Sequence, residues 1–526
     1  MFDAIVVGGL VVDGTGAVGR ETDVGIQGDQ IVAVGDLSTA EAALSLNAVG
    51  YVVAPGFIDI HSHSDFTLLV DPRAQSQIYQ GVTTELVGNC GHGCVPITDD
   101  IELFTGNIYG YQDLIDIDWS DMDGYLARLE EAQTAVNVAT LVPNGNLRLA
   151  AVSDVGRPAT PNETNHMARL LEAGLDAGAF GFSTGLEYPP ERQASEAEII
   201  ELCRVVAGRD SLYATHERQR DVGAIAAIEE GIRAGDASGV RLQLSHIIPR
   251  RGAPESALQQ MIELVERARE RGLNVEFDAH TRLHGITNLS AALPQWALAG
   301  GPGQLADRLG DPATRERMKQ YESIISSFGV GGWDRVSVFA SDGTPDSVGR
   351  SLADLTPQGG DALDTIYDLL LAEGDDPHRA LVIVHSYEEE MLREAFRHPL
   401  CTTESDATAL CVDGPLEAET FLGAYTWAAW FFRHMVREHR QLSLEEAVHK
   451  LTAQPAGRIG LRDRGVLREG CKADIAVLDV ARYGEQGSLE DPNRLATGIV
   501  HLFVNGGLTL VDGRETGQRH GRVLRR

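Results

Sequence analysis

The sequence predicts an α/β protein: a TIM-like (β/α)8 barrel, a small β-sandwich domain built from both termini, and an inserted lid segment. Three observations predict this architecture. Between residues 55 and 460, short apolar strand-like runs alternate with helix-like stretches, whereas 1–54 and 461–526 consist mainly of β-like runs separated by turns. The stretch at about 297–354 is rich in Gly and Asp, so we expect it to leave the barrel and form the lid.

The two terminal segments have the composition of one common β-domain. Near the start, 11–14 and 26–31 combine apolar residues with the turn signals of hairpins. Near the end come apolar runs at 473–478 and 499–506, and Val504-Asn505-Gly506-Gly507 is a strong hairpin signal. Because both ends share this character, we expect them to pair beside the barrel.

The central segment supplies the barrel strands. An apolar run at 51–57 is expected to be the opening buried strand. Nine further strand candidates follow, at 82–87, 136–142, 180–183, 212–215, 242–245, 275–278, 336–339, 381–384 and 401–403. Helix-like stretches separate several of them, as at 196–206, 222–231 and 255–271. Repeated βα units favour a closed barrel of about eight strands over an open doubly wound sheet, so some candidates are surplus or belong to the insertion.

The composition excludes several classes of partner. Acidic residues outnumber basic ones by 77 to 44, giving a formal net charge of −33, which argues against binding nucleic acid or anionic membranes. The start, Met1 to Ala4, lacks the basic region of a signal peptide, and no apolar run has membrane-spanning length. Six cysteines in 526 residues do not make a disulfide framework. We therefore expect a cytoplasmic protein that acts on a small molecule, with assembly into a homo-oligomer as an open alternative.

Two histidines directly follow the opening strand, in the sequence His61-Ser62-His63. Residues i and i+2 of a strand point to the same face, so both imidazoles can converge on one object. Imidazoles at the C-terminal end of a barrel strand suit a divalent metal ion. The alternative is a pair of solvated or hydrogen-bonded histidines in a polar turn.

Five more chemically capable residues follow other strand candidates: Cys90, Tyr188, His216, His246 and Asp406. Each alone has an ordinary interpretation, because such a cysteine is usually a buried hydrophobe and such an aspartate is usually a helix N-cap. As a set with the two histidines, they predict a metal site at one end of the barrel. Zinc accepts imidazole, thiolate and carboxylate ligands, and a thiolate can bridge two ions.

These residues lie in motifs that resemble the amidohydrolase superfamily, specifically its N-acyl-D-amino-acid deacylase (D-aminoacylase) branch, over nearly the whole chain. The motif around Cys90 is the most specific, since most related amidohydrolases have a carboxylated lysine there. The matching segments are Ala54–Asp59 before the two histidines, Gly81–Thr84, Gly88–Gly91, Ser183–Tyr188, Thr215-His216 with Arg218, Ser245-His246, Ser405-Asp406, Leu444–Val448, Asp463–Gly465 and Gly470–Asp474.

The resemblance implies the cofactor and the reaction. A tightly held Zn²⁺ is expected on Cys90, His216 and His246, with a weaker second position near His61, His63, Cys90 and Asp406. Zinc lowers the pKa of bound water to about 7, so metal-bound hydroxide would attack the C–N amide bond of an N-acyl compound. Asp406 is expected to act as general base and then general acid, with Tyr188 helping to stabilise the oxyanion.

The substrate motifs of the branch are altered. Ile248 stands where a lysine that binds the amino-acid carboxylate is expected, the segment 278–287 replaces a Tyr-Pro-Tyr and Ser-Thr motif, and a His-Pro-Arg motif is missing. A lost clamp forfeits a charge-assisted hydrogen bond of about 1.5–3 kcal/mol. Either Arg250, Arg251 or Arg282 replaces it, or the substrate lacks that carboxylate, and the second alternative is favoured. Further candidate substrate contacts are Arg218, His280 and His284.

The leading hypothesis is therefore a zinc-dependent amidohydrolase similar to N-acyl-amino-acid deacylases. A second hypothesis keeps the metal and opens the ring of a cyclic amide, imide or lactone, with deamination as a lesser variant. A third makes the chain a scaffold without catalytic metal, against which the complete ligand set argues.

Overall fold

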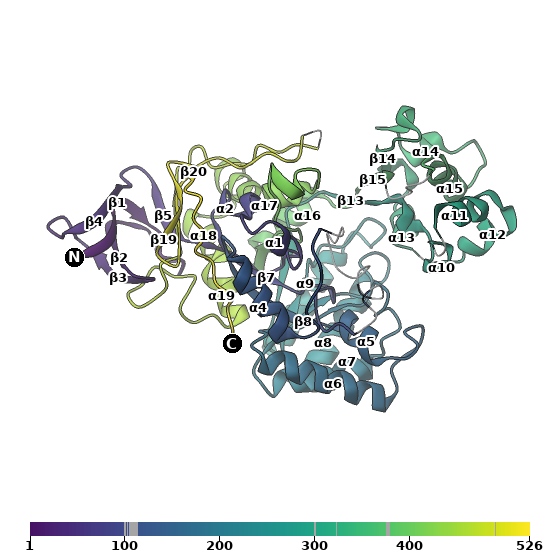
Figure 1. Ribbon diagram of the computed structural model, residues 1–526, viewed down its shortest axis with the longest axis horizontal. Helices are drawn as coiled ribbons and strands as arrows, with labels where there is room; N and C mark the ends of the chain where they lie inside the picture. Colours follow the sequence, from purple (N-terminus) through teal and green to yellow (C-terminus); the bar gives the residue numbers. More distant parts are fainter. Residues whose placement is uncertain are drawn as a thin grey trace.

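The computed structural model describes residues 1–98, 101, 104, 114–298, 301–321, 323–374, 379–489 and 491–526. Figure 1 shows three parts: a β-domain that contains the N-terminus, a barrel in the middle, and an inserted unit set to one side of the barrel. Each part has a hydrophobic core of its own. No helix within the described ranges combines the length and apolarity that crossing a bilayer requires.

Both ends of the chain build one separate β-domain, as the sequence predicts. Its nine strands form one sheet in the order β20-β19-β18-β17-β5-β1-β2-β3, with β4 paired to β1. The strands are β1 (Phe2–Val11), β2 (Arg20–Gln27), β3 (Gln30–Gly35), β4 (Ala42–Asn47), β5 (Val52–Pro55), β17 (Ile475–Leu478), β18 (Ile499–Val504), β19 (Gly507–Val511) and β20 (Arg514–Glu515). The predicted hairpin joins β18 to β19, and Asn505 and Gly506 have the positive φ angles, 48° and 79°, that a two-residue turn requires.

Eight parallel strands form the barrel, in the order β16-β12-β11-β10-β9-β8-β7-β6. They are β6 (Phe57–Asp59), β7 (Val82–Val87), β8 (Asn137–Pro143), β9 (Gly181–Gly185), β10 (Leu212–His216), β11 (Arg241–Leu244), β12 (Val275–His280) and β16 (Cys401–Glu404). A parallel bridge between Ser62 and Ala407 joins the two outer strands just beyond their ends, so the sheet is nearly closed. The predicted barrel is therefore present, and all its strand C-termini point toward one rim.

Helices cover the barrel and connect its strands. They are α1 (Thr67–Val70), α2 (Gln75–Ile78), α4 (Met122–Ala132), α5 (Asn144–Ala151), α6 (Pro161–Asp176), α7 (Glu196–Ala207), α8 (Ala224–Ser238), α9 (Ala257–Glu270), α16 (Glu389–Arg397), α17 (Leu422–Phe432), α18 (Leu444–Leu451) and α19 (Ala453–Ile459). Local sequence sets several of their starts. Thr160 and Glu163 form a capping box at α6, with Pro161 at the first helical position, and Ser195 caps α7.

The opening apolar run is not one strand, so that prediction is wrong. Its first half, β5, pairs with β1 and β17 in the β-domain, and only Phe57–Asp59 joins the barrel. The break falls at Gly56, where an added Cβ would lie 2.2 Å from the Thr83 hydroxyl. A run buried throughout gives no sign of which sheet each half joins, because both environments select the same apolar residues.

The inserted unit is longer than the expected 297–354. It contains a three-stranded antiparallel sheet in the order β13-β15-β14, formed by β13 (His284–Asn288), β14 (Val336–Ala340) and β15 (Leu381–His385). The two surplus strand candidates are β14 and β15. Helices α10 (Gln295–Leu298), α11 (Pro302–Gly310), α12 (Pro312–Met318), α13 (Ile324–Val330), α14 (Leu352–Leu355) and α15 (Ala362–Ala372) complete the unit. Positions 299, 300 and 322 of the expected lid lie outside the described residues.

Candidate metal centre

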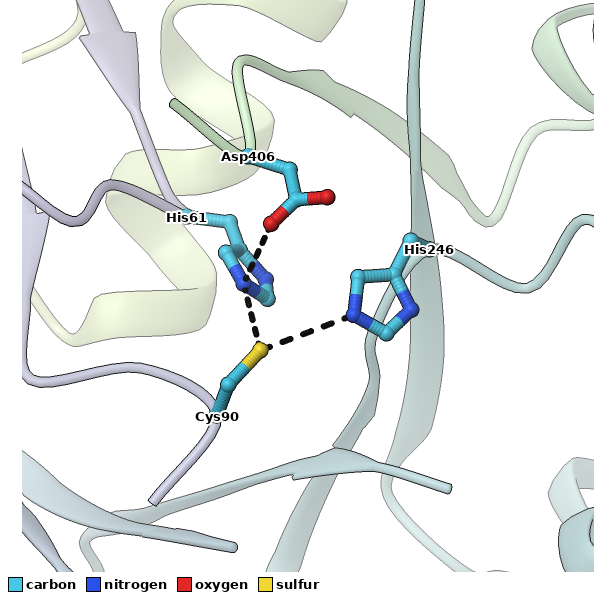
Figure 2. Close-up of side chains that lie close together, drawn as sticks. All are labelled: His61, Cys90, His246 and Asp406. Atoms are coloured by element: carbon cyan, nitrogen blue, oxygen red, sulfur yellow. Dashed lines mark hydrogen bonds and ion pairs between the residues drawn. The ribbon is translucent and has the colours of Figure 1, made fainter. Parts of the chain in front are cut away.

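A cluster of ligand-type side chains occupies the rim formed by the C-terminal ends of the barrel strands. Figure 2 shows His61, Cys90, His246 and Asp406 pointing toward one another from four different strand ends. The Cys90 Sγ atom lies 3.1 Å from His61 Nε2 and 3.6 Å from His246 Nε2. All four ligand atoms lie within 4.8 Å of one another, a spacing that one or two metal ions would bridge.

The remaining two predicted ligands adjoin this cluster. His216 Nδ1 lies 3.6 Å from Cys90 Sγ, and His63 Nε2 lies 3.2 Å from Asp406 Oδ1. The structure therefore brings together all six residues that the sequence singled out as ligands. Cys90 is at the centre, within hydrogen-bonding range of three imidazoles.

The backbone adopts an unfavourable conformation at three of these positions. Cys90, His246 and Asp406 have φ angles of 51°, 34° and 42°, in the left-handed region that residues with a Cβ rarely adopt. Surrounding hydrogen bonds hold two of them: the His246 amide donates to Asp278 Oδ1 at 2.6 Å, and the Asp406 amide donates to the His61 carbonyl at 3.0 Å. Strain of about 1–3 kcal/mol per residue is typical of functional sites.

Burial gives these groups the protonation states that suit metal binding. It lowers the pKa of His61 to about 3 and that of His216 to about 4, although Glu187 raises the latter. Both imidazoles are therefore neutral at pH 7 and offer a lone pair. Burial also raises the pKa of the Cys90 thiol well above its usual range, so a thiolate there needs a nearby cation. Neutral imidazoles and a thiol that ionises only beside a cation are the donors that a divalent ion requires.

A second layer of side chains orients the ligands. His216 Nε2 lies 2.8 Å from Glu187 Oε2, so it donates there and leaves Nδ1 as an acceptor facing Cys90. Arg250 binds both oxygens of Glu187, at 2.7 and 2.6 Å. Burial opposes ionisation of Glu187, but Arg250 and His216 together hold the pKa of that carboxyl below its usual range. This carboxylate–histidine pair is typical of metal sites.

Comparison with known proteins agrees with the barrel and its cluster. The model of the amidohydrolase family matches residues 46–514. The chain belongs to the amidohydrolase family. It is 32% identical over 530 residues to an N-acyl-D-glutamate deacylase of Alcaligenes xylosoxydans xylosoxydans, covering 100% of this chain and 97% of that protein.

Among the similar solved structures are two that are each 30% identical to this chain and cover 100% of it and 100% of their own length. One is a D-aminoacylase described with a binuclear metal centre, in which one metal activates and the second attenuates, with a TM-score of 0.80. The other is an N-acyl-D-glutamate deacylase from Bordetella bronchiseptica in complex with zinc and a phosphonate inhibitor, with a TM-score of 0.79. The chain is therefore similar throughout to N-acyl-D-amino-acid deacylases.

A cavity of about 280 Å³ opens beside the cluster of ligand-type side chains. Three of the residues predicted as substrate contacts, Tyr188, Arg250 and Arg282, line it. The two arginines already have carboxylate partners, because Arg250 binds Glu187 and Arg282 forms an ion pair with Asp406. Neither guanidinium is free to bind a substrate carboxylate unless it leaves its present partner.

The other predicted substrate contacts do not line this cavity. Arg218 is paired with Glu230 and donates to two backbone carbonyls, and Arg251 is paired with Glu388. His284 stacks on His385, with ring centroids 4.9 Å apart.

His280 is fully buried near the cluster, with its ring 4.6 Å from that of Tyr387. Neither ring nitrogen of His280 hydrogen-bonds to any part of the chain that the structure describes.

Sequence reasoning missed three residues of the site. Glu187 lies directly before Tyr188, within the motif Ser183–Tyr188, but nothing in the sequence indicated its role. Arg220 lies four residues after His216 and lines the cavity. Tyr387 also lines the cavity, and it follows β15 of the inserted unit, a segment that gave no chemical signal.

Proposed function

We propose that this amidohydrolase hydrolyses the C–N amide bond of an N-acyl compound with the help of zinc. The observation that carries the proposal is Cys90, whose sulfur is surrounded by three imidazoles and lies in one cluster with Asp406. The similar proteins whose names describe deacylation of N-acyl-D-amino acids support the same reaction class.

Cys90, His216 and His246 would hold the tightly bound zinc. A second, weaker position would lie among His61, His63, Cys90 and Asp406. When bound, zinc supplies a Lewis acid for the amide carbonyl and lowers the pKa of water to about 7.

Asp406 is the proton carrier of the proposed reaction. Its Oδ1 atom faces His63 and His61, at 3.2 and 3.7 Å, and Oδ2 is held by Arg282. Burial opposes ionisation, but Arg282 and the neighbouring histidines hold the pKa of Asp406 well below its usual range. A carboxylate that stays ionised at the rim can accept a proton from water and donate it to the departing nitrogen.

Tyr188 would donate a hydrogen bond to the developing oxyanion. Its ring packs 4.6 Å from that of His216, and it lines the cavity. Burial raises the pKa of its hydroxyl, so the group keeps its proton at neutral pH. A neutral donor aimed at developing negative charge is the arrangement that favours acyl transfer.

Amine release from N-acetyl substrates by the zinc-loaded protein tests this proposal. We expect Cys90→Ala to lose turnover by several orders of magnitude, because the central ligand of the cluster is removed. Cys203→Ala is a matched control, since Cys203 is also fully buried but lies in α7 away from the cluster. A folded Cys90→Ala protein with normal turnover would refute the assignment.

The same assay separates the alternatives, because opening a cyclic amide releases no second product and deamination releases ammonia. Assembly into a homo-oligomer and a cytoplasmic location stay predictions.

A further inference from the structure

Three arginines line the cavity beside the cluster, and they differ in their partners. Arg250 binds Glu187 and Arg282 binds Asp406. Arg220 is also buried, at 4% exposure, but no carboxylate oxygen of the described residues lies within 4.0 Å of its guanidinium. Arg220 is thus the cation of this cavity that lacks an acidic partner in the described part of the chain.

Within the described part of the chain, only one nitrogen of the Arg220 guanidinium donates hydrogen bonds. One terminal nitrogen donates to the carbonyls of His246 and Ile248, at 2.7 and 3.1 Å. The Nε atom is buried and makes no hydrogen bond to the described residues. The guanidinium carbon lies 5.3 Å from the centre of the Tyr387 ring, which supports one face of the cation.

A buried guanidinium without a counter-ion is costly, so such groups are normally paired. Its planar array of donors matches a carboxylate in two-point geometry. Two buried side chains adjoin this guanidinium: Ile248 is apolar, and the carboxyl of Glu217 lies more than 4.0 Å away and makes no hydrogen bond to it. The arrangement fits an anion that arrives with the substrate.

The position of Arg220 also restricts where that anion lies on the substrate. Its guanidinium donates to the carbonyl of His246, one of the residues of the cluster, so it lies beside the cluster at which the amide bond would react. In an N-acyl amino acid, the carboxylate carbon is two bonds from the amide nitrogen. A receptor next to the cluster suits that short separation.

We propose that Arg220 binds the carboxylate of the substrate, and that the substrate is an N-acyl amino acid with a free carboxyl group next to the scissile amide. This inference rests on the proposed amide hydrolysis. It opposes the expectation, drawn from the missing lysine, that the substrate lacks a carboxylate.

The test compares zinc-loaded wild type with Arg220→Met and Arg220→Lys. The substrates are N-acetylalanine, as both enantiomers, and N-acetylalaninamide, which lacks the charge. We expect the wild type to prefer the acid. Arg220→Met should raise KM for the acid by about 10- to 100-fold with a smaller change in kcat, and should leave the amide nearly unaffected. Arg220→Lys should restore part of the preference, because it keeps the charge but loses the two-point geometry.

Arg251→Met is the matched control, because Arg251 neighbours the cavity but is paired with Glu388 outside it. It should leave the preference for the acid unchanged. Equal losses with acid and amide in Arg220→Met would mean that Arg220 only supports the backbone after β11, and would overturn the proposal. So would a wild type that prefers the amide, a result that needs no variant to fold.

Measuring the binding of these compounds tests the role of Arg220 independently of the proposed reaction. If the wild type turns over neither compound, calorimetry with the same two compounds still measures the receptor. Tighter binding of N-acetylalanine than of its amide, lost in Arg220→Met, would support the receptor even if the reaction assignment fails. Equal binding of the two compounds would overturn it.

Discussion

Glu187→Gln should weaken the affinity for zinc while the barrel stays folded. Glu187 accepts from His216 Nε2 at 2.8 Å and binds Arg250 through both oxygens. The substitution keeps the shape of the side chain and removes its charge. His216 then loses the anionic acceptor that fixes which of its nitrogens carries the proton.

Two magnitudes follow from this geometry. Loss of a partner behind a metal-bound histidine typically costs about 10- to 100-fold in metal affinity. The side chains of Arg250 and Glu187 are 7% and 13% exposed, so breaking their ion pair should also cost about 3–5 kcal/mol of stability, partly offset by the hydrogen bonds that Gln retains. Competition with a chelator measures the first quantity, and thermal unfolding of the metal-free protein measures the second.

Glu388→Gln provides the control for this prediction. Glu388 is also paired with an arginine, Arg251, but the two side chains are 43% and 30% exposed. Its loss should cost at most about 1 kcal/mol and should not change zinc affinity. Equal zinc affinities in Glu187→Gln and the wild type would refute the role given to Glu187.

Two further predictions concern Glu191, which is buried behind the cluster and accepts from Gly185 N and Asn144 Nδ2, at 3.0 and 2.7 Å. Burial raises the pKa of Glu191 to about 8, so between about pH 4.5 and 8 the folded state holds a proton that the unfolded chain has released. Stability should therefore fall by about 1.4 kcal/mol per pH unit over this window from this group, and Glu191→Gln should remove that slope in denaturant titrations. Gly91→Ala should destabilise by about 2 kcal/mol or more, because its Cβ would lie 1.6 Å from Glu191 Oε1. Gly16→Ala, which has a similar positive φ but open space, should cost less in the same titration, and equal losses would contradict the steric explanation.

The parts of the site that could be predicted from sequence are those encoded locally. His61 and His63 follow a strand with a spacing of two, and Cys90, His216 and Asp406 each lie just beyond a strand candidate. Because a barrel places all strand C-termini on one rim, local position was enough to predict that these side chains converge.

The partners of the arginines could not be predicted in this way. Arg250 pairs with a residue 63 positions away and Arg282 with one 124 positions away, so both were expected to be free for substrate. Which cation is left without a partner depends on the whole three-dimensional arrangement, and Arg220 went unnoticed. The limits of the inserted unit were missed for the same reason, since β13 pairs with β15 across about a hundred residues.

Titration of zinc into the metal-free protein, with amine release recorded at each step, tests the central claim most directly. The account predicts that turnover of N-acetyl substrates rises with the first equivalent of zinc per chain. In Asp406→Asn, zinc should still bind, because the proposed tight site is made by Cys90, His216 and His246, but turnover should stay near zero. Full turnover in the metal-free wild type, or normal turnover in Asp406→Asn, would contradict the account.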